Sequence, residues 1–508
     1  MNGNNLKTIM QRTLLIVFLF FSFSDLIFSN TVHVVDITDK TPDEKVLLAS
    51  IQGILSKKNV LMYLQDNNIF WSETFKDNGL DITECKSIDD LLKKFEKHIK
   101  GFVLADLNNI MVAATLAGPL ESIIVTEEIL KRYPQISKHI DMAYDARGKD
   151  EEWLLDYVQE SANSYSLDAI TQHNPKAPWA LIDFSIKNNY ICVVCDNNPN
   201  LMSAFYSIIK PNSPKYGFGT PYHNEFKDVS LGATHGLFTV PSANTLNLSF
   251  YSSFKGKSQQ ARMSDRELQK SRAHYVMIMM SDGDNLNWTI GGCISNKKYM
   301  GNSQCKEYPI NWMYPTIAKS VSGYVHEYYM KNKPLNNYFI GSVSGIGYTY
   351  PSNHKQMDVF SEISNESYKK CGIEYSVIMD TLDLSVPRKP VLDNMIYNMP
   401  DIKGFYYMDY GNYAKWKGKT FMINNKPVHS FRYRLWLPKD PLEKIADMIN
   451  HSSRDVTNID AYSSVVVHVW SYGIDDVIRF INLLDDDVIL VNASEFMNLL
   501  KHNVLNHE

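Results

Sequence analysis

Apolar and polar positions alternate along most of the chain in an order that predicts strands and helices in turn. From residue 31, apolar runs such as TVHVVDI and NVLMYLQ are separated by stretches with helical spacing, among them PDEKVLLASIQGILSKK and SIDDLLKKFEKHIKG. Strands that alternate with helices through short connections are typical of α/β folds. The pattern therefore predicts small α/β modules in the N-terminal half.

The C-terminal half repeats the same pattern more regularly. Its seven strand-like runs are HYVMIMM, NYFIGSV, EYSVIM, GFYYM, SFRYRLW, SSVVVHVW and DDVILV, with helical patterns between most of them. The connection TFMINNKPVHS predicts a β-hairpin instead. Several runs are almost wholly apolar, as expected of parallel strands covered on both faces. Seven β/α units fit either a doubly wound sheet or a (β/α) barrel-like domain of about seven strands, and we favour the barrel.

Polar stretches predict where one module ends and the next begins. DMAYDARGKDEE separates two N-terminal modules, and KGKSQQARMSDRELQKSR is interpreted as the linker into the C-terminal domain. We therefore expect a leader over residues 1–29, α/β modules over 30–140, 141–200 and 201–262, and the barrel-like domain over 270–508.

Carboxylates, aromatic rings, Arg and His follow six of the seven predicted C-terminal strands. In chain order they are Asp282, Asp284 and Trp288; Gly345, Gly347, Tyr348 and Tyr350; Asp380 and Asp383; Asp409; Arg434 and Trp436; and His468 and Trp470. In a β/α barrel these strand ends meet at one face, where active sites lie. Their convergence predicts a functional site and is the reason for favouring the barrel.

The stretch SDGDN has three interpretations. Asp282 or Asp284 fits general acid/base chemistry on a glycosidic bond, with Asp409 as the partner from another strand and Asp380 or Asp383 as alternatives. Carboxylate and amide oxygens also suit a hard cation such as Ca²⁺. A plain turn is the third possibility, because Asp-Gly and Asp-Asn form turns.

The stretch GSVSGIGYTYPSNH places glycines beside large aromatic side chains at a strand end. We expect Gly345 and Gly347 to adopt positive φ and turn the chain back over the barrel mouth. Tyr348 and Tyr350 would then lie over a pocket, where ring faces and hydroxyls suit a sugar. The alternative is a structural turn whose tyrosines pack sideways. After it, SNH predicts the capped start of a helix.

The charge of the chain and two further sequence features bear on its function. The net charge is −5 and no basic run occurs, so nothing indicates nucleic-acid binding. His468 lies among valines, where a histidine is usually buried, although its strand-end position makes it a candidate for proton transfer or metal binding. The loop GTPYHNE, residues 219–225, is a candidate to reach the pocket, although nothing in the sequence argues that it does.

The N-terminus predicts a secretory signal peptide. Lys7 and Arg12 precede TLLIVFLFFSFSDLIFS, an apolar run interrupted by serines and Asp25. No later segment is long and apolar enough to cross a bilayer, so we expect an exported chain, secreted or periplasmic; an uncleaved anchor is the alternative. Export permits disulfides, and Cys293 with Cys305 is the expected pair.

Residues 345–351, GIGYTYP, match the pattern G-x-G-Y-x-Y-P, and the chain resembles the GxGYxYP family of glycoside hydrolases. YVMIMMSDGDNLNW, KPVHSFRYRLW, VVVHVWSYG and LLASIQGILSKKNVLMYL resemble other parts of that family, so the likeness covers nearly all of the chain after the leader. The resemblance implies N-terminal α/β modules, a barrel-like catalytic domain and an exported protein acting on carbohydrate. By the family motif, the resemblance implies that the glycines and tyrosines of the motif, Pro351, and the acidic turn with Asp282 and Asp284 belong to the site. It supplies no mechanism, and no role for Asp409 or His468.

Three functions follow from these observations. We favour a glycoside hydrolase that needs no cofactor, in which Asp282 or Asp284 pairs with Asp409 and an oligo- or polysaccharide contacts Trp288, Tyr348, Trp436, Trp470 and Arg434. A looser similarity to polysaccharide deacetylases suggests a divalent cation held by Asp282, Asp284 and His468, although the usual pair of metal-binding histidines is missing. A non-catalytic glycan-binding protein is the third. The sugar, the linkage and the oligomeric state do not follow from the sequence.

Overall fold

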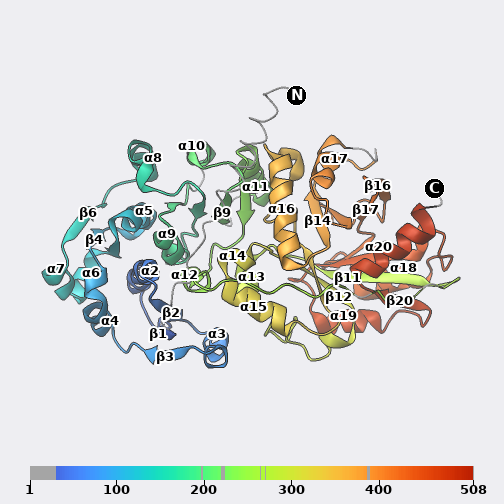
Figure 1. The fold of residues 1–508 in the computed structure, drawn as a ribbon, viewed down its shortest axis with the longest axis horizontal. Coiled ribbons are helices and arrows are strands. Elements are labelled where there is room, and N and C mark those ends of the chain that lie inside the picture. Colours follow the sequence, from blue (N-terminus) through green and yellow to red (C-terminus); the bar gives the residue numbers. More distant parts are fainter. Residues whose placement is uncertain are drawn as a thin grey trace, which may run out of the picture.

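The computed structural model describes residues 30–195, 198–218, 224–263, 265–268, 270–385 and 389–506. Small α/β units occupy one side of the molecule, and a large domain built on one curled sheet occupies the other (Figure 1). The leader predicted over residues 1–29 lies outside the described residues. Across the described part of the chain, no helix has both the length and the apolarity needed to span a bilayer.

Two three-stranded parallel sheets form the first N-terminal units. The first has the order β2-β1-β3 and consists of β1 (Thr31–Asp36), β2 (Leu61–Gln65) and β3 (Asp81–Glu84). The second has the order β5-β4-β6 and consists of β4 (Gly101–Leu104), β5 (Ser122–Val125) and β6 (Met142–Asp145). The predicted α/β alternation is therefore confirmed in this half of the chain.

Helices separate these strands, and their ends follow the sequence. The longest, α2 (Pro42–Lys57), begins with a capping box of Thr41 and Glu44 and with proline in its first turn, both helix-start signals. The others are α3 (Phe70–Glu73), α4 (Ile88–Phe95), α5 (Ile110–Leu120), α6 (Glu127–Arg132), α7 (Gln135–His139) and α8 (Glu151–Glu160).

A third N-terminal unit contains a four-stranded parallel sheet with the order β10-β9-β7-β8. Its strands are β7 (Ile170–Gln172), β8 (Ile191–Val193), β9 (Pro214–Gly217) and β10 (Phe238–Val240), and its helices are α9 (Ile182–Asn188), α10 (Pro199–Ile208), α11 (Glu225–Thr234) and α12 (Leu248–Tyr251). The sheet takes strands from both sides of residue 200, where the sequence had placed a module boundary. In Figure 1, α11 and β9 of this third unit lie between the first two N-terminal units and α16 (Met357–Cys371) of the large domain.

The large domain is built on a sheet with ten strands in the described residues. They are β11 (His274–Met280), β12 (Ile310–Tyr314), β13 (Tyr338–Gly341), β14 (Tyr375–Asp380), β15 (Gly404–Asp409), β16 (Thr420–Ile423), β17 (Lys426–Ser430), β18 (Tyr433–Leu435), β19 (Tyr462–Val467) and β20 (Val488–Val491). The order is β16-β17-β15-β14-β13-β12-β11-β19-β18, and β20 also pairs with β11. The pair β16–β17 is antiparallel and is the predicted hairpin.

The sheet curls, and one extended segment connects its two sides. The strands β17 and β18 follow each other along the chain: Phe431 donates its N–H to Tyr407 of β15 (3.1 Å), and Arg432 donates its N–H to Ser464 of β19 (3.1 Å). The layout differs from the expected seven strands in two places. The strand β12 was not predicted, and β20 pairs only with the first half of β11, because β12 takes the second half on that side.

Side chains alternate between the inside and the outside of the curled sheet, as strand geometry requires. Along β11, Met277 and Met279 belong to a cluster inside the curl, and Ile278 and Met280 belong to the core under the outer helices. Those helices are α13 (Leu286–Ile290), α14 (Ala318–Val321), α15 (Gly323–Asn332), α16, α17 (Pro390–Tyr397), α18 (Leu442–Asn450) and α19 (Ile474–Ile481). The helix α20 (Ala493–Leu500) packs instead against the cluster inside the curl.

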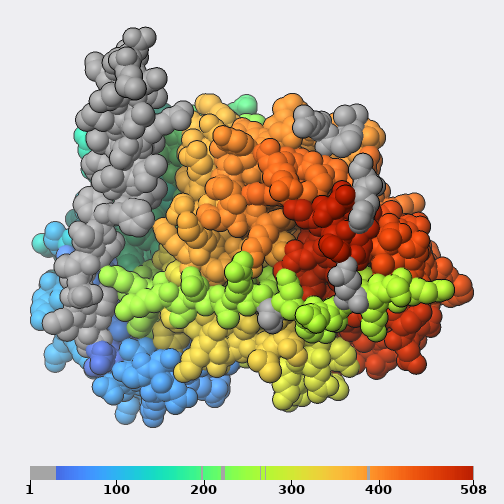
Figure 2. Space-filling model, turned by 45° about the vertical axis from the view of Figure 1, so that its right-hand side comes forward, coloured from blue at the N-terminus to red at the C-terminus, as the bar shows by residue number. Residues whose placement is uncertain are grey.

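The predicted linker over residues 255–272 forms no helix in its described part but is fastened to the large domain. Gln260 donates its side-chain N–H to the carbonyl of Phe339 (2.8 Å), and Arg266 pairs with the buried Glu495 (2.7 Å). Figure 2 shows this segment in a yellow-green band along the surface, with the yellow part of the large domain on one side and its orange and red parts on the other.

The predicted disulfide between Cys293 and Cys305 is wrong. All six cysteines are described, and none is in a disulfide. The Cys305 thiol donates instead to the Asn337 amide oxygen (3.0 Å).

Candidate active site

The stretch SDGDN forms a tight turn directly after β11. Asp282 has a φ of +60°, a left-handed conformation that aspartate tolerates better than most residues. A Cβ on Gly283 would lie 2.7 Å from the Cβ of Met313 and closer still to its carbonyl oxygen, so only glycine fits against β12. Asn285 then caps α13 by accepting the N–H of Trp288 (3.1 Å). The turn is thus fixed on both sides.

Three carboxylates line a cavity of about 30 Å³ at the carboxyl ends of the strands. Its lining consists of Glu225, Asp282, Asp284, Met313, Val343, Tyr348, Met379, Met408 and Tyr413. A cavity of this size holds about one water molecule. Asp282 and Asp284 come from the turn after β11, but Glu225 comes from the first turn of α11 in the third N-terminal unit. The site is therefore shared between two parts of the chain.

Of the three carboxylates of the cavity, Asp282 accepts hydrogen bonds from two side chains. Its oxygens accept the hydroxyl of Ser281 and the indole N–H of Trp470 (3.2 Å). Burial raises the pKa of Asp282, whereas the Ser281 hydrogen bond, the nearby His468 and the Trp470 hydrogen bond lower it. These donors favour the ionised form of Asp282 relative to its neighbours.

Burial and neighbouring charges hold Asp284 toward its neutral form, whereas the Tyr348 hydrogen bond favours the ionised form of Glu225. Burial raises the pKa of Asp284 well above its usual value, and the negative charges of Asp282 and Glu225 raise it further. Burial also raises the pKa of Glu225, opposed by the Tyr348 hydroxyl, which donates to Oε1 of Glu225 (2.7 Å). A carboxyl group that stays protonated near neutral pH is the usual form of a general acid.

His468 lies beside this cluster and packs against Trp436. Their ring centroids are 3.9 Å apart with planes at 12°, and Nδ1 of His468 is 3.1 Å from the Ser471 hydroxyl. Burial lowers the pKa of His468, and Asp282 raises it. Within the described ranges, no group of three or more His, Cys, Asp or Glu side chains is arranged to hold a metal ion.

The glycines of the GIGYTYP motif allow close packing rather than an unusual backbone. Neither has positive φ, so the predicted positive φ at Gly345 and Gly347 is wrong. A Cβ on Gly345 would lie 2.5 Å from the Phe360 ring, and one on Gly347 would lie 3.0 Å from the carbonyl oxygen of Thr239 in β10. Two backbone hydrogen bonds of 2.8 Å join Tyr348 to Thr239. The motif therefore docks the large domain onto the third N-terminal unit.

The two motif tyrosines are buried, and Tyr348 contacts a carboxylate of the cavity through its hydroxyl. Tyr348 is 2% exposed and Tyr350 is fully buried, and their hydroxyl oxygens are 2.7 Å apart. Pro351 begins a short 3-10 helix (Pro351–Asn353), and α16 begins only at Met357, without a side-chain cap. The predicted capped helix start at SNH is therefore wrong.

Asp409 is not among the described residues that line the cavity. It follows Met408 in β15, and because strand side chains alternate, Met408 faces the cavity while Asp409 faces away. Its carboxylate pairs with Lys415 (3.0 Å) and accepts the N–H of Gly411 (3.1 Å).

The other two aspartates proposed as alternatives also serve local structure. Asp380 is buried and accepts both the backbone N–H (2.7 Å) and the hydroxyl (2.6 Å) of Ser352. Asp383 is exposed and accepts the hydroxyl of Ser385 (2.8 Å). Glu225 lies at the cavity with Asp282 and Asp284, whereas Asp380, Asp383 and Asp409 are not among its lining residues.

Aromatic side chains surround the acidic turn, and one of them is open to solvent. Trp470 is 51% exposed, and its ring centroid lies 6.3 Å from that of the half-buried Trp288. Arg434 is engaged by Asp440 (2.6 Å) and by the Asn412 amide oxygen (2.8 Å). Trp470 is thus an accessible ring whose N–H contacts a carboxylate of the cavity.

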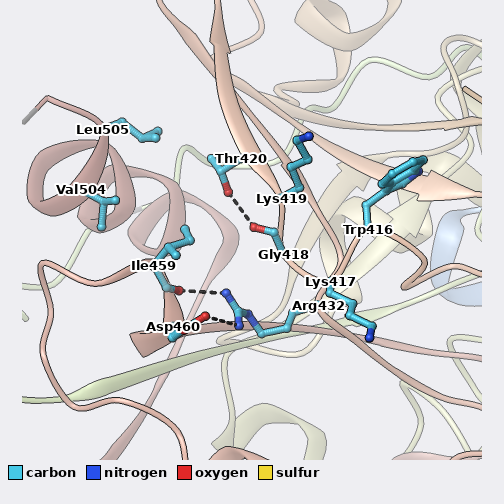
Figure 3. Close-up of a pocket in the computed structure, with 10 residues that line it drawn as sticks. All are labelled: Trp416, Lys417, Gly418, Lys419, Thr420, Arg432, Ile459, Asp460, Val504 and Leu505. Carbon is cyan, nitrogen blue, oxygen red and sulfur yellow. Dashed lines mark hydrogen bonds and ion pairs between the residues drawn. The ribbon is translucent and has the colours of Figure 1, made fainter. Parts of the chain in front are cut away.

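A larger pocket of about 320 Å³ lies elsewhere, beside the segment that connects β17 and β18 (Figure 3). Arg432 lines this pocket and donates to Asp460 (2.8 Å) and to the carbonyl of Ile459 (3.1 Å). The side chains of Lys417 and Lys419 point away from Arg432 in Figure 3. This pocket shares no lining residue with the carboxylate cavity.

The sequence did not identify Glu225 as a site residue, although the loop GTPYHNE that ends in it was a candidate to reach the pocket. The signal that identifies it is spatial, because Glu225 is 57 residues before Asp282 in the chain and reaches the cavity only after two units dock.

Three models of known protein families match separate parts of the chain. Residues 31–97 match the model described as "GxGYxYP_N 1st domain", residues 167–253 match "GxGYxYP third domain", and residues 272–501 match "GxGYxYP putative glycoside hydrolase C-terminal domain". The last two meet at the carboxylate cavity, since Glu225 lies in one and Asp282 and Asp284 lie in the other.

A solved structure is similar over nearly the whole chain. It is described as "a putative hydrolase from Bacteroides thetaiotaomicron VPI-5482", with a TM-score of 0.84 and 20% identity over 93% of this chain and 95% of that one. At this identity the likeness shows a shared fold. No curated protein matches the chain. The three domain matches extend from the first strand to the last helix, and the chain belongs to the GxGYxYP family.

Proposed function

We propose that the protein is an exported glycoside hydrolase whose acid/base groups are the carboxylates of the shared cavity. The observation that carries the proposal is that Glu225, Asp282 and Asp284 line one cavity at the carboxyl ends of the strands, each with a raised pKa. Carboxylates whose environments differ are what glycosidic bond cleavage requires. The description of the family as glycoside hydrolases supports the same reaction class.

The surroundings of each carboxylate suggest its role. Asp284 has a strongly raised pKa, so it is the proton donor to the leaving oxygen. Asp282, which accepts hydrogen bonds from Ser281 and Trp470, is the carboxylate that remains ionised and faces the developing positive charge on the sugar ring. Glu225 supplies negative charge that keeps Asp284 protonated. Trp470 provides the exposed ring on which a sugar packs.

The experiment that tests this proposal measures sugar release from a broad panel of oligo- and polysaccharides, with and without a chelator. We expect release that the chelator leaves unchanged. Loss of activity with the chelator and recovery with a divalent ion would indicate a metal-dependent, deacetylase-like hydrolase instead. Binding without release on every glycan would indicate a glycan-binding protein.

The pH profile should report the raised pKa of Asp284. Activity requires the protonated form, so it is retained up to the raised pKa and lost as the pH rises through it. Glu225→Gln removes one of the negative charges that raise this pKa, so we expect the alkaline limb of kcat/KM to move to lower pH. The exposed Asp383→Asn is the matched control and should leave the limb in place. An alkaline limb that is identical in wild type and Glu225→Gln would contradict these roles.

A further inference from the structure

A buried ion pair connects the sheet of the third N-terminal unit to α11, the helix of the same unit that carries Glu225. Lys215 of β9 is 0% exposed, and its ammonium group contacts the carboxylate of Asp228 and the amide oxygen of Gln172 in β7 (3.0 Å). The Asp228 side chain is 8% exposed. A buried charge is tolerated only where partners of this kind compensate it.

The position of Asp228 in α11 relates this ion pair to the cavity. It follows Glu225 by three residues, so the two side chains lie about one turn apart on the same side of the helix. At the cavity end, Glu225 accepts the Tyr348 hydroxyl (2.7 Å), and the ring of Phe226 packs against Tyr350 with centroids 4.8 Å apart. Along α11, the ion pair therefore lies about one turn after the contacts with the motif tyrosines.

We infer that Lys215 and Asp228 are positioning residues, which fix α11 so that Glu225 reaches the carboxylate cavity. The inference rests on the proposed function of that cavity. It extends the machinery of the site to residues that touch no substrate, in a unit outside the curled sheet.

Net stability is a poor explanation for this pair. Replacing a buried ion pair by well-packed apolar residues is often neutral or stabilising. The stability of the fold alone therefore does not require these two charges. A charged hydrogen bond adds a fixed direction and distance, and α11 needs both because Glu225 must meet side chains from another domain. A displacement of about 1 Å at such a site costs about 100-fold in rate.

The test compares Lys215→Met with the double variant Lys215→Met/Asp228→Leu, which removes both charges of the pair. Lys210→Met is the matched control, because the Lys210–Asp168 pair lies in the same unit with side chains 64% and 65% exposed. We expect kcat to fall by about 100-fold in both Lys215 variants with little change in KM, and to stay at the wild-type value in Lys210→Met. Recovery of wild-type kcat in the double variant would overturn the inference, because packing alone would then suffice.

Hydrogen exchange of the α11 amides gives a measurement that needs no substrate. We expect faster exchange over residues 225–234 in Lys215→Met than in wild type, with exchange in β11 and β12 unchanged. Wild-type exchange in α11 would overturn the positioning role whatever the activity. An inactive wild type with faster α11 exchange in the variant would instead place the failure in the proposed function.

Discussion

Asp284→Asn should reduce kcat by about 100- to 10,000-fold, the range typical of a lost general acid. The amide has nearly the same shape as the carboxyl group, so binding of the substrate should persist and KM should change little. The exposed Asp383→Asn is the control and should retain full activity. Wild-type turnover in Asp284→Asn would exclude Asp284 as the proton donor.

The same substitution should raise the thermal stability at neutral pH. The folded-state pKa of Asp284 is raised, so its contribution to stability is present below the unfolded-state pKa and is lost as the pH rises through the folded-state pKa. Asparagine does not ionise and avoids this loss. Melting temperatures of wild type and variant should therefore diverge as the pH is raised from 4 toward 8, with the variant higher.

Gly283→Ala should lower the activity by displacing the backbone of the acidic turn. The added methyl group would lie 2.7 Å from the Cβ of Met313 and nearer to its carbonyl group, which belongs to β12 and has little freedom to move. The turn that carries Asp282 and Asp284 must shift instead. We expect a loss of about 100-fold in kcat/KM and a decrease of about 1–3 kcal/mol in the free energy of unfolding.

Gly232→Ala is the matched control for this substitution. Gly232 lies inside α11, and the nearest atoms to an added Cβ are 3.9 Å away. Alanine is favoured over glycine in a helix by about 1 kcal/mol, so this variant should be at least as stable as wild type and fully active. Equal activity in Gly283→Ala and Gly232→Ala would show that the tight contact with Met313 does not hold the acidic turn in place.

The strand ends were the part of the site that the sequence could predict. Strongly apolar runs identified β11, β14, β15 and β19, and the residues that follow β11 lie in the cavity as expected. The hairpin of β16 and β17 was also evident, because Asn424 and Asn425 form a turn at positive φ between two short strands. Local sequence determines these features, so they can be predicted without a structure.

Features that depend on contacts between distant segments could not be predicted in this way. The third carboxylate of the cavity is Glu225, which meets Asp284 only because α11 docks against the large domain, whereas Asp409 at a strand end faces away from the cavity. The glycines of GIGYTYP have ordinary φ values, and what requires them is the proximity of Phe360 and Thr239, which no local pattern reveals. The strand β12 was missed because Asn311 lies within it, where it hydrogen bonds to β11 and α20.

The GIGYTYP motif has a structural role in joining two domains. Its backbone pairs with β10, its glycines permit that approach, and Tyr348 holds Glu225 by a hydrogen bond. A substitution in the motif should therefore affect the relative placement of two domains as well as the cavity between them. This explains how residues matched by two separate family models form one site.

The measurement that tests the central claim most directly is a crystal structure of Asp284→Asn with an oligosaccharide that the wild type cleaves. We predict that the sugar packs on Trp470 and that the glycosidic oxygen lies within hydrogen-bonding distance of residue 284, with Asp282 and Glu225 around the same ring. A sugar bound away from these three side chains would contradict the assignment of the cavity as the catalytic site.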